Sequence, residues 1–277
     1  MFKKLRWLRK IHISCAIFVI YTIFSNCYCD KPSVKPGFKI VSISPAMTEI
    51  LFAVGAGNDI VGVTTFCNYP EAAKKIYKIG DFSNPSIERI VGLKPDIVIV
   101  NLPEQMRIKK QLEKLGVTIF VSSPKSLNDI YKEIAGIGKI VKKERAADSL
   151  IHYMKMNIGP SEHKRKKSVY IELSPRPLVT IGAHSFLNEM LEMAGGKNIF
   201  SDLNKDYPVV SQEEVIKRNP EIIILLHPGN ITDRLAWKKI AAIKKDKVYT
   251  NLNQDHILRP GPRSVEGFKE LQRIIRE

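Results

Sequence analysis

Cysteine is scarce in this chain of 277 residues, which contains only four. The spacing of Cys27, Cys29 and Cys67 matches neither a disulfide framework nor a zinc site. An enzyme built around an iron–sulfur cluster would need more cysteines at suitable spacing. We therefore predict no metal site, and we expect Cys67 to be a small, partly buried thiol, with a bridge to Cys29 as the alternative.

Catalytic motifs are also lacking. The sequence contains no Gly-x-Ser-x-Gly, no His-Glu-x-x-His and no phosphate-binding glycine loop. We therefore predict no catalytic residues and no resident cofactor. A focused basic patch with interleaved aromatics is missing too, although the net charge is +16. Lysines spread along helical faces favour solvation and attraction to anionic lipid over nucleic-acid binding.

The N-terminal segment has the order of a secretory signal. Residues 1–26 carry five basic residues and no acid, and the apolar run from Ile11 to Phe24 is too short to span a bilayer comfortably. Cleavage before Cys27 would leave a lipid-bearing N-terminal cysteine with residues 27–37 as a tether, and cleavage after Cys29 would leave an ordinary N-terminus. Both predict a protein outside the cytoplasmic membrane, in the periplasm or at the membrane's outer face. An uncleaved anchor helix is the alternative.

One short pattern occurs twice, at residues 86–100 and 211–225. Each copy has a serine, a glutamate two residues later, an apolar pair, then a proline, an acid and an aliphatic run. Serine is a good N-cap, an early acid suits the helix dipole, and proline stops the helix before a strand buried on both faces. The repeat predicts two lobes of similar design, and the alternative is a chance match of a common element.

The remaining patterns predict an α/β fold of two lobes with mainly parallel sheets. Strands alternate with helices at short spacing in residues 38–125 and again in residues 168–277. No strand pattern interrupts residues 126–167, which we expect to form a helical connector. Long irregular stretches precede both repeat copies and contain aromatics, and such loops tend to be functional.

Several stretches together resemble the substrate-binding proteins of ABC importers for vitamin B12, haem and iron siderophores, whose two lobes are joined by a single long interlobe helix. The resemblance runs from about Phe38 to the C-terminus. It rests on residues 43–49, 67–70, 80–91, 186–199, 237–240 and 259–263.

The resemblance implies roles for the two repeated glutamates. In that family one exposed glutamate on each lobe docks against arginines of the permease dimer, and Glu88 and Glu213 match those positions. Such carboxylate–arginine pairs fix orientation. The alternative role of each glutamate is to complement the dipole of its own helix.

The resemblance also implies that a small metal chelate binds between the lobes. Tyr69, Phe82 and Tyr207 lie in irregular chain, and flat aromatic faces suit a rigid macrocycle. Leu173 and Val179 stand where other pocket aromatics of the B12-binding branch would be expected. We predict cobalamin as the ligand, with haem or a ferric siderophore as alternatives. Candidate cationic contacts are Arg176, Arg259 and Arg263, and candidate metal-binding histidines are His184, His227 and His256.

Two other classes stay open at this point. A metal-centre enzyme of related α/β architecture would contain iron in the purified protein. A membrane-anchored adhesin or scaffold would bind no small ligand.

Overall fold

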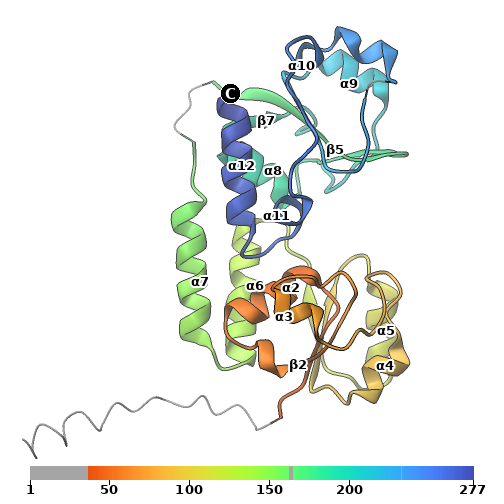
Figure 1. Cartoon of the computed structure of the whole chain (residues 1–277), viewed down its shortest axis with the longest axis vertical. Helices are drawn as coiled ribbons and strands as arrows, with labels where there is room; N and C mark the ends of the chain where they lie inside the picture. The colour runs from red at the N-terminus through yellow and green to blue at the C-terminus, as the bar shows by residue number, and fades with distance from the viewer. Residues whose placement is uncertain (1–36, 162–164, 232) are drawn as a thin grey trace, which may run out of the picture. The chain divides into compact units, whose positions relative to one another are not determined.

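The computed structural model describes residues 37–161, 165–231 and 233–277, and all of these lie in one compact unit (Figure 1). The predicted signal segment, Cys27, Cys29 and nearly all of the tether fall outside the described residues. None of the helices in the described part is long and apolar enough to cross a membrane.

The first lobe contains a four-stranded parallel sheet in the order β2-β1-β3-β4. Its central strand β3 is buried at four of five positions, as expected for a strand covered on both faces. The strands are β1 (Ile40–Ser42), β2 (Ile60–Val63), β3 (Ile97–Asn101) and β4 (Ile119–Ser122), and the helices are α2 (Pro45–Ala53), α3 (Glu71–Lys74), α4 (Ile87–Gly92) and α5 (Met106–Lys114).

The second lobe repeats this arrangement around a longer central strand. Strand β5 pairs with β8 in parallel, and β8 pairs with β9, as β1, β3 and β4 do in the first lobe. Along its other edge β5 pairs in parallel with β7 and antiparallel with β6. The strands are β5 (Lys167–Pro175), β6 (Leu178–Thr180), β7 (Gly196–Asn198), β8 (Ile222–Leu225) and β9 (Val248–Tyr249).

The two repeat copies form equivalent elements, so the predicted helix-to-strand unit is confirmed. Helix α4 leads into β3, and helix α9 (Gln212–Arg218) leads into β8. Ser86 and Ser211 are the N-caps, and each hydroxyl accepts a hydrogen bond of 3.2 Å from the backbone N–H three residues later. The α/β fold with mainly parallel sheets is likewise confirmed.

Two helices of 14 residues make up the connector: α6 (Leu127–Ile140) and α7 (Glu144–Asn157). The chain turns between them, where Lys142 adopts a positive φ of 54°. Helix α6 packs against α7 and also contacts α2 of the first lobe and α8 (Phe186–Met193) of the second. Helix α6 therefore touches both lobes, while α7 lies against it and precedes β5 in the chain (Figure 1).

The C-terminal segment belongs to the second lobe by chain order but packs on both. Its elements are η2 (Leu235–Lys239), α10 (Ala241–Lys244), α11 (Gln254–Leu258) and α12 (Ser264–Arg276). The largest apolar cluster joins Met47 and Ile50 of α2 with Ile134 of α6 and Phe268 of α12. One continuous core thus connects the two sheets, because residues from both lobes contribute to it.

Candidate functional site

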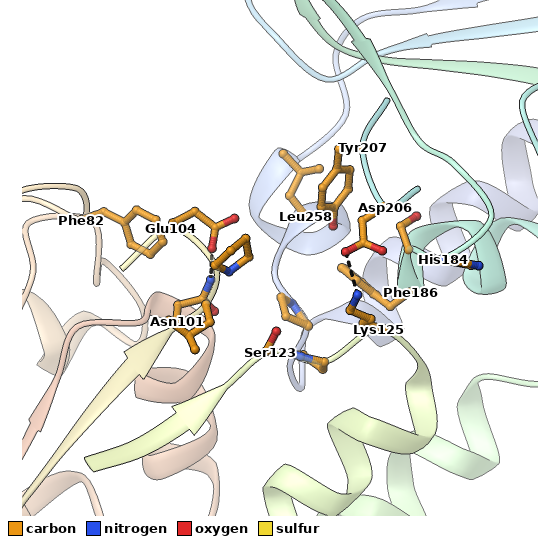
Figure 2. A pocket seen from close by; sticks show the side chains of 15 residues that line it. Phe82, Asn101, Glu104, Ser123, Lys125, His184, Phe186, Asp206, Tyr207 and Leu258 are labelled. Carbon is orange, nitrogen blue, oxygen red and sulfur yellow. Dashed lines mark hydrogen bonds and ion pairs between the residues drawn. The ribbon is translucent and has the colours of Figure 1, made fainter. Parts of the chain in front are cut away.

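A cavity of about 210 Å³ lies between loops of the two lobes (Figure 2). Its first-lobe wall follows the carboxyl ends of β3 and β4, where open parallel sheets usually place their binding residues. Its second-lobe wall comes from the start of α8 and the irregular stretch before the second repeat copy. The lining residues are Phe82, Asn101, Leu102, Pro103, Glu104, Ser123, Pro124, Lys125, His184, Ser185, Phe186, Asp206, Tyr207, Leu258 and Pro260.

A second cavity of about 450 Å³ adjoins the first at the start of α2. The two share Phe82, Asn101, Leu258 and Pro260, and we call them together the cleft. The remaining residues that line the second cavity are Ser44, Pro45, Ala46, Phe66, Ser83, Gln254, Asp255 and Arg259.

The first-lobe wall is held by a buried glutamine. Gln105 is fully buried, and its side-chain amide donates to the carbonyl oxygens of Ile43 at 2.9 Å and Phe82 at 2.8 Å. Its Oε1 accepts from the backbone N–H of Asn101 at 2.7 Å. The Asn101 side chain in turn donates to Glu104 Oε2 at 2.8 Å. Buried amides with all partners satisfied rigidify a loop, so this wall is preorganised.

Charge in the first cavity is mainly negative. The carboxylates of Glu104 and Asp206 face it, and the one lysine that lines it, Lys125, lies 3.2 Å from Asp206 Oδ2. The pKa of the Tyr207 hydroxyl is raised to about 12, first by removal from water and then by the negative charges of Asp206 and Glu104. Tyr207 therefore stays protonated, and a phenolate that could ligate a metal is disfavoured there.

The structure brings some of the predicted ligand residues together. Phe82 lines both cavities, Tyr207 lines the first and Arg259 the second. Tyr69 does not appear among the described residues that line either cavity; its ring lies under the Arg263 guanidinium, 4.2 Å from ring centre to Cζ. Arg176 is exposed on the turn between β5 and β6, also away from both linings. Contact of any of these residues with ligand stays a prediction.

The three candidate histidines occupy different surroundings. His184 is exposed and lines the first cavity. His227 is buried, with its Nε2 2.9 Å from Glu172 Oε1. His256 lies in α11, where its Nε2 is 3.2 Å from the Asn253 amide nitrogen. In residues 37–161, 165–231 and 233–277 no group of three or more His, Cys, Asp or Glu side chains is placed to hold a metal ion.

Both repeated glutamates are exposed in the first turn of their helices. The pKa of Glu213 is lowered, first by a hydrogen bond from its own backbone N–H and then by the Ser211 hydroxyl. This arrangement keeps the Glu213 carboxylate ionised in mildly acidic solution. Glu88 and Glu213 are thus free of the core and carried at equivalent positions of the two lobes.

Sequence reasoning missed most of the polar residues in the cleft. Asn101, Ser123 and Lys125 directly follow the predicted strands of the first lobe, and this position was a usable signal because carboxyl ends of parallel strands gather at one edge. Asp206 and Leu258 had no comparable signal, since Asp206 lies in irregular chain and Leu258 ends the short helix α11.

Comparisons with known proteins agree on one family of binding proteins. The profile of a family described as periplasmic binding protein matches residues 40–253. The substrate-binding lipoprotein YvrC of Bacillus subtilis, an ABC transporter component described as uncharacterised, is 36% identical over 86% of this chain and 79% of its own length. A vitamin B12-binding protein of Vibrio campbellii is 29% identical over 85% of this chain and 88% of its own.

Solved structures resemble the described fold closely. One, titled a possible iron-binding periplasmic solute-binding protein of Staphylococcus epidermidis, superposes with a TM-score of 0.76 at 34% identity, covering 87% of this chain and 99% of that one. The periplasmic vitamin B12 binding protein of Vibrio cholerae superposes with a TM-score of 0.73 at 26% identity, covering 87% and 97%.

Proposed function

The chain belongs to the periplasmic binding protein family, and from this membership we propose that it binds a corrinoid, vitamin B12 itself, and delivers it to an ABC import permease. The observation that places a corrinoid above haem is the charge of the cleft. Relatives from two Vibrio species named for vitamin B12 binding add support.

Cleft charge favours a neutral or cationic chelate. In the first cavity Glu104 and Asp206 together outweigh Lys125, which is itself paired with Asp206. In the second cavity Arg259 is paired with Asp255 and Glu49, so the described lining offers no lysine or arginine without an acidic partner. The edge of a corrin carries neutral amide groups, whose N–H donors suit carboxylate acceptors. Haem presents two propionates instead, and these would meet like charge, which costs affinity.

Aromatic faces supply the apolar part of the proposed contact. Phe82 and Tyr207 lie on opposite lobes, and Figure 2 shows them on the two sides of the cavity, with Leu258 nearer to Tyr207. Flat rings desolvate a macrocycle without requiring a particular hydrogen-bond pattern. Orientation would then come from Asn101, Glu104 and the other polar groups of the wall.

Titration tests this proposal directly. Calorimetric or tryptophan-fluorescence titration of residues 37–277 with cyanocobalamin, haem and a ferric hydroxamate separates the ligands. We expect micromolar or tighter binding of cyanocobalamin and no comparable binding of haem. Tight binding of a siderophore alone would overturn the corrinoid proposal.

An iron chelate is the second candidate, because the Staphylococcus epidermidis relative with 34% identity is described as a possible iron-binding protein. The negative charge of the cleft limits which iron chelates can be considered. A neutral ferric hydroxamate fits the cleft as well as a corrinoid does, whereas an anionic catecholate complex or haem does not.

Docking to the permease is proposed to use Glu88 and Glu213. Reversing both charges with Glu88→Arg and Glu213→Arg should abolish uptake of the ligand while leaving its affinity for the isolated protein unchanged, since neither residue lines the described cleft. Glu71→Arg with Glu266→Arg is the matched control, because these are also exposed first-turn glutamates, one from each half of the chain. Lost ligand affinity in the first pair would place those residues in the pocket instead.

Export and anchoring complete the proposal. We propose that residues 1–26 direct export and that Cys27 carries the lipid, in keeping with the lipoprotein description of the Bacillus relative. Mass spectrometry of the mature N-terminus distinguishes an acylated Cys27 from cleavage after Cys29.

A further inference from the structure

An ion-pair cluster around one buried carboxylate ties the C-terminal segment to the first lobe. Glu49 lies on α2, with 3% of its surface exposed. Its carboxylate accepts from Arg259 Nη1 at 2.8 Å and from Arg263 Nε and Nη2 at 2.9 and 2.6 Å. Three charge-assisted hydrogen bonds to one buried carboxylate make a rigid joint between segments more than 200 residues apart in sequence.

Neighbouring groups complete the cluster. Asp255 Oδ1 lies 2.8 Å from Arg259 Nη2, so two acids offset two arginines. The amide of Asn68 accepts from Arg259 Nη1 at 2.8 Å and donates to Asp255 at 3.2 Å. Polar atoms that would be costly to bury alone are thereby partnered.

The cluster adjoins the cleft. Arg259 Nη2 donates to the carbonyl oxygen of Phe66 at 3.2 Å, and Phe66, Arg259 and Asp255 all line the second cavity. The next residues along the chain, Leu258 and Pro260, line both cavities. The joint at Glu49 therefore sits directly behind the cleft wall.

Backbone packing on α2 reinforces this joint. A Cβ atom added at Gly261 would meet the carbonyl oxygen of Ala46 at 3.4 Å, so the loop after α11 lies close over the first turn of α2. Ser264 Oγ donates to the Gly261 carbonyl at 2.7 Å and holds the loop in this path. The wall formed by residues 258–260 has little freedom while Glu49 holds the two arginines.

We propose that Glu49 is a positioning residue for the ligand. By fixing Arg259 and Arg263 it holds the Phe66 and Leu258 parts of the cleft wall at the spacing that the ligand requires. The ligand part of this statement rests on the proposed function. The positioning part concerns the chain alone and can be measured without ligand.

Glu49→Gln tests the idea, with Glu172→Gln as the matched control. Glu172 is a buried carboxylate of the second lobe that accepts from Arg234 Nη1 and Nη2 at 2.7 and 2.6 Å. It is outside the described lining of both cavities. Each variant removes the charge of a buried carboxylate that accepts hydrogen bonds from arginine, and of the two carboxylates only Glu49 lies behind the cleft.

We expect cyanocobalamin to bind Glu49→Gln at least about tenfold more weakly and Glu172→Gln within about twofold of wild type. Hydrogen exchange should speed up in Glu49→Gln at residues 66–69 and 254–260, and it should not do so in Glu172→Gln. Unchanged exchange at those residues in Glu49→Gln would overturn the proposal. Equal loss of affinity in both variants would also do so.

Two further arms keep the test decisive. If Glu49→Gln does not fold, Asp255→Asn replaces it, because Asp255 is partly exposed and its loss leaves Glu49 in place. Asp255→Asn should show a smaller increase in hydrogen exchange at the same residues, and no increase there would contradict the proposal. If wild type binds no cyanocobalamin, the corrinoid proposal fails and the exchange measurement alone decides the role of Glu49.

Discussion

Replacing Tyr207 with alanine removes the largest aromatic surface that the second lobe offers to the cleft. The side chain has 46% of its surface exposed, within a cavity that it shares with Phe82 from the first lobe. A bound macrocycle would cover this exposed part. The expected loss of affinity can therefore be worked out from the area that the ligand buries.

Burying a phenylalanine-sized side chain completely stabilises by about 1.5 to 3 kcal/mol, so covering half of Tyr207 contributes roughly 1 kcal/mol. Favourable ring geometry adds about 0.5 to 1.5 kcal/mol. The sum is about 1 to 3 kcal/mol, or an affinity lowered by about 5- to 150-fold. A larger loss would indicate that the variant has also changed the loop.

Calorimetric titration with cyanocobalamin measures this loss. Tyr153→Ala is the control, because Tyr153 lies on α7, is 45% exposed and is outside the described cleft lining. It should bind like wild type. The reasoning is refuted if Tyr207→Ala also binds like wild type, or if both variants weaken binding equally.

Two further predictions concern stability. Hydrogen bonding from the Ser168 backbone N–H, assisted by Arg165, lowers the pKa of Glu221 below 4.5. The stability that the Glu221 carboxylate contributes is therefore present above that pH and is lost as pH falls through the lower pKa of the folded state. Urea unfolding between pH 6 and 3 should show a smaller loss of stability for Glu221→Gln than for wild type, and an equal loss would contradict this. Asn219 has a φ of 45°, and its side-chain oxygen accepts from the Ala241 backbone N–H at 2.8 Å. Asn219→Ala should lower the free energy of unfolding by about 2 kcal/mol, and Asn219→Gly by only about 1 kcal/mol, since glycine tolerates that φ. Equal losses in the two variants would contradict the backbone argument.

The repeat units were predictable because each of their signals acts within one or two turns. Ser86 and Ser211 cap their own helices, and the proline and aliphatic run that follow act on adjacent residues. The α/β fold follows from such local patterns. Phe82 and Tyr207, from the irregular stretches before the two repeats, line the same cavity, and their contact with ligand stays a prediction.

The features that were not predicted from the sequence depend on contacts between residues far apart in the chain. The Tyr69 ring lies under Arg263, a residue almost two hundred positions later, and nothing local to Tyr69 indicates this contact. Nothing local to Glu49 indicates that two arginines reach it, and only the fold brings them there.

Uptake of labelled cyanocobalamin by cells tests the central claim most directly. Cells that lack this protein should lose uptake, and the wild-type gene should restore it, while the gene carrying Glu88→Arg and Glu213→Arg should not. Unchanged cobalamin uptake in the deletion strain, together with lost uptake of a ferric hydroxamate, would contradict the account.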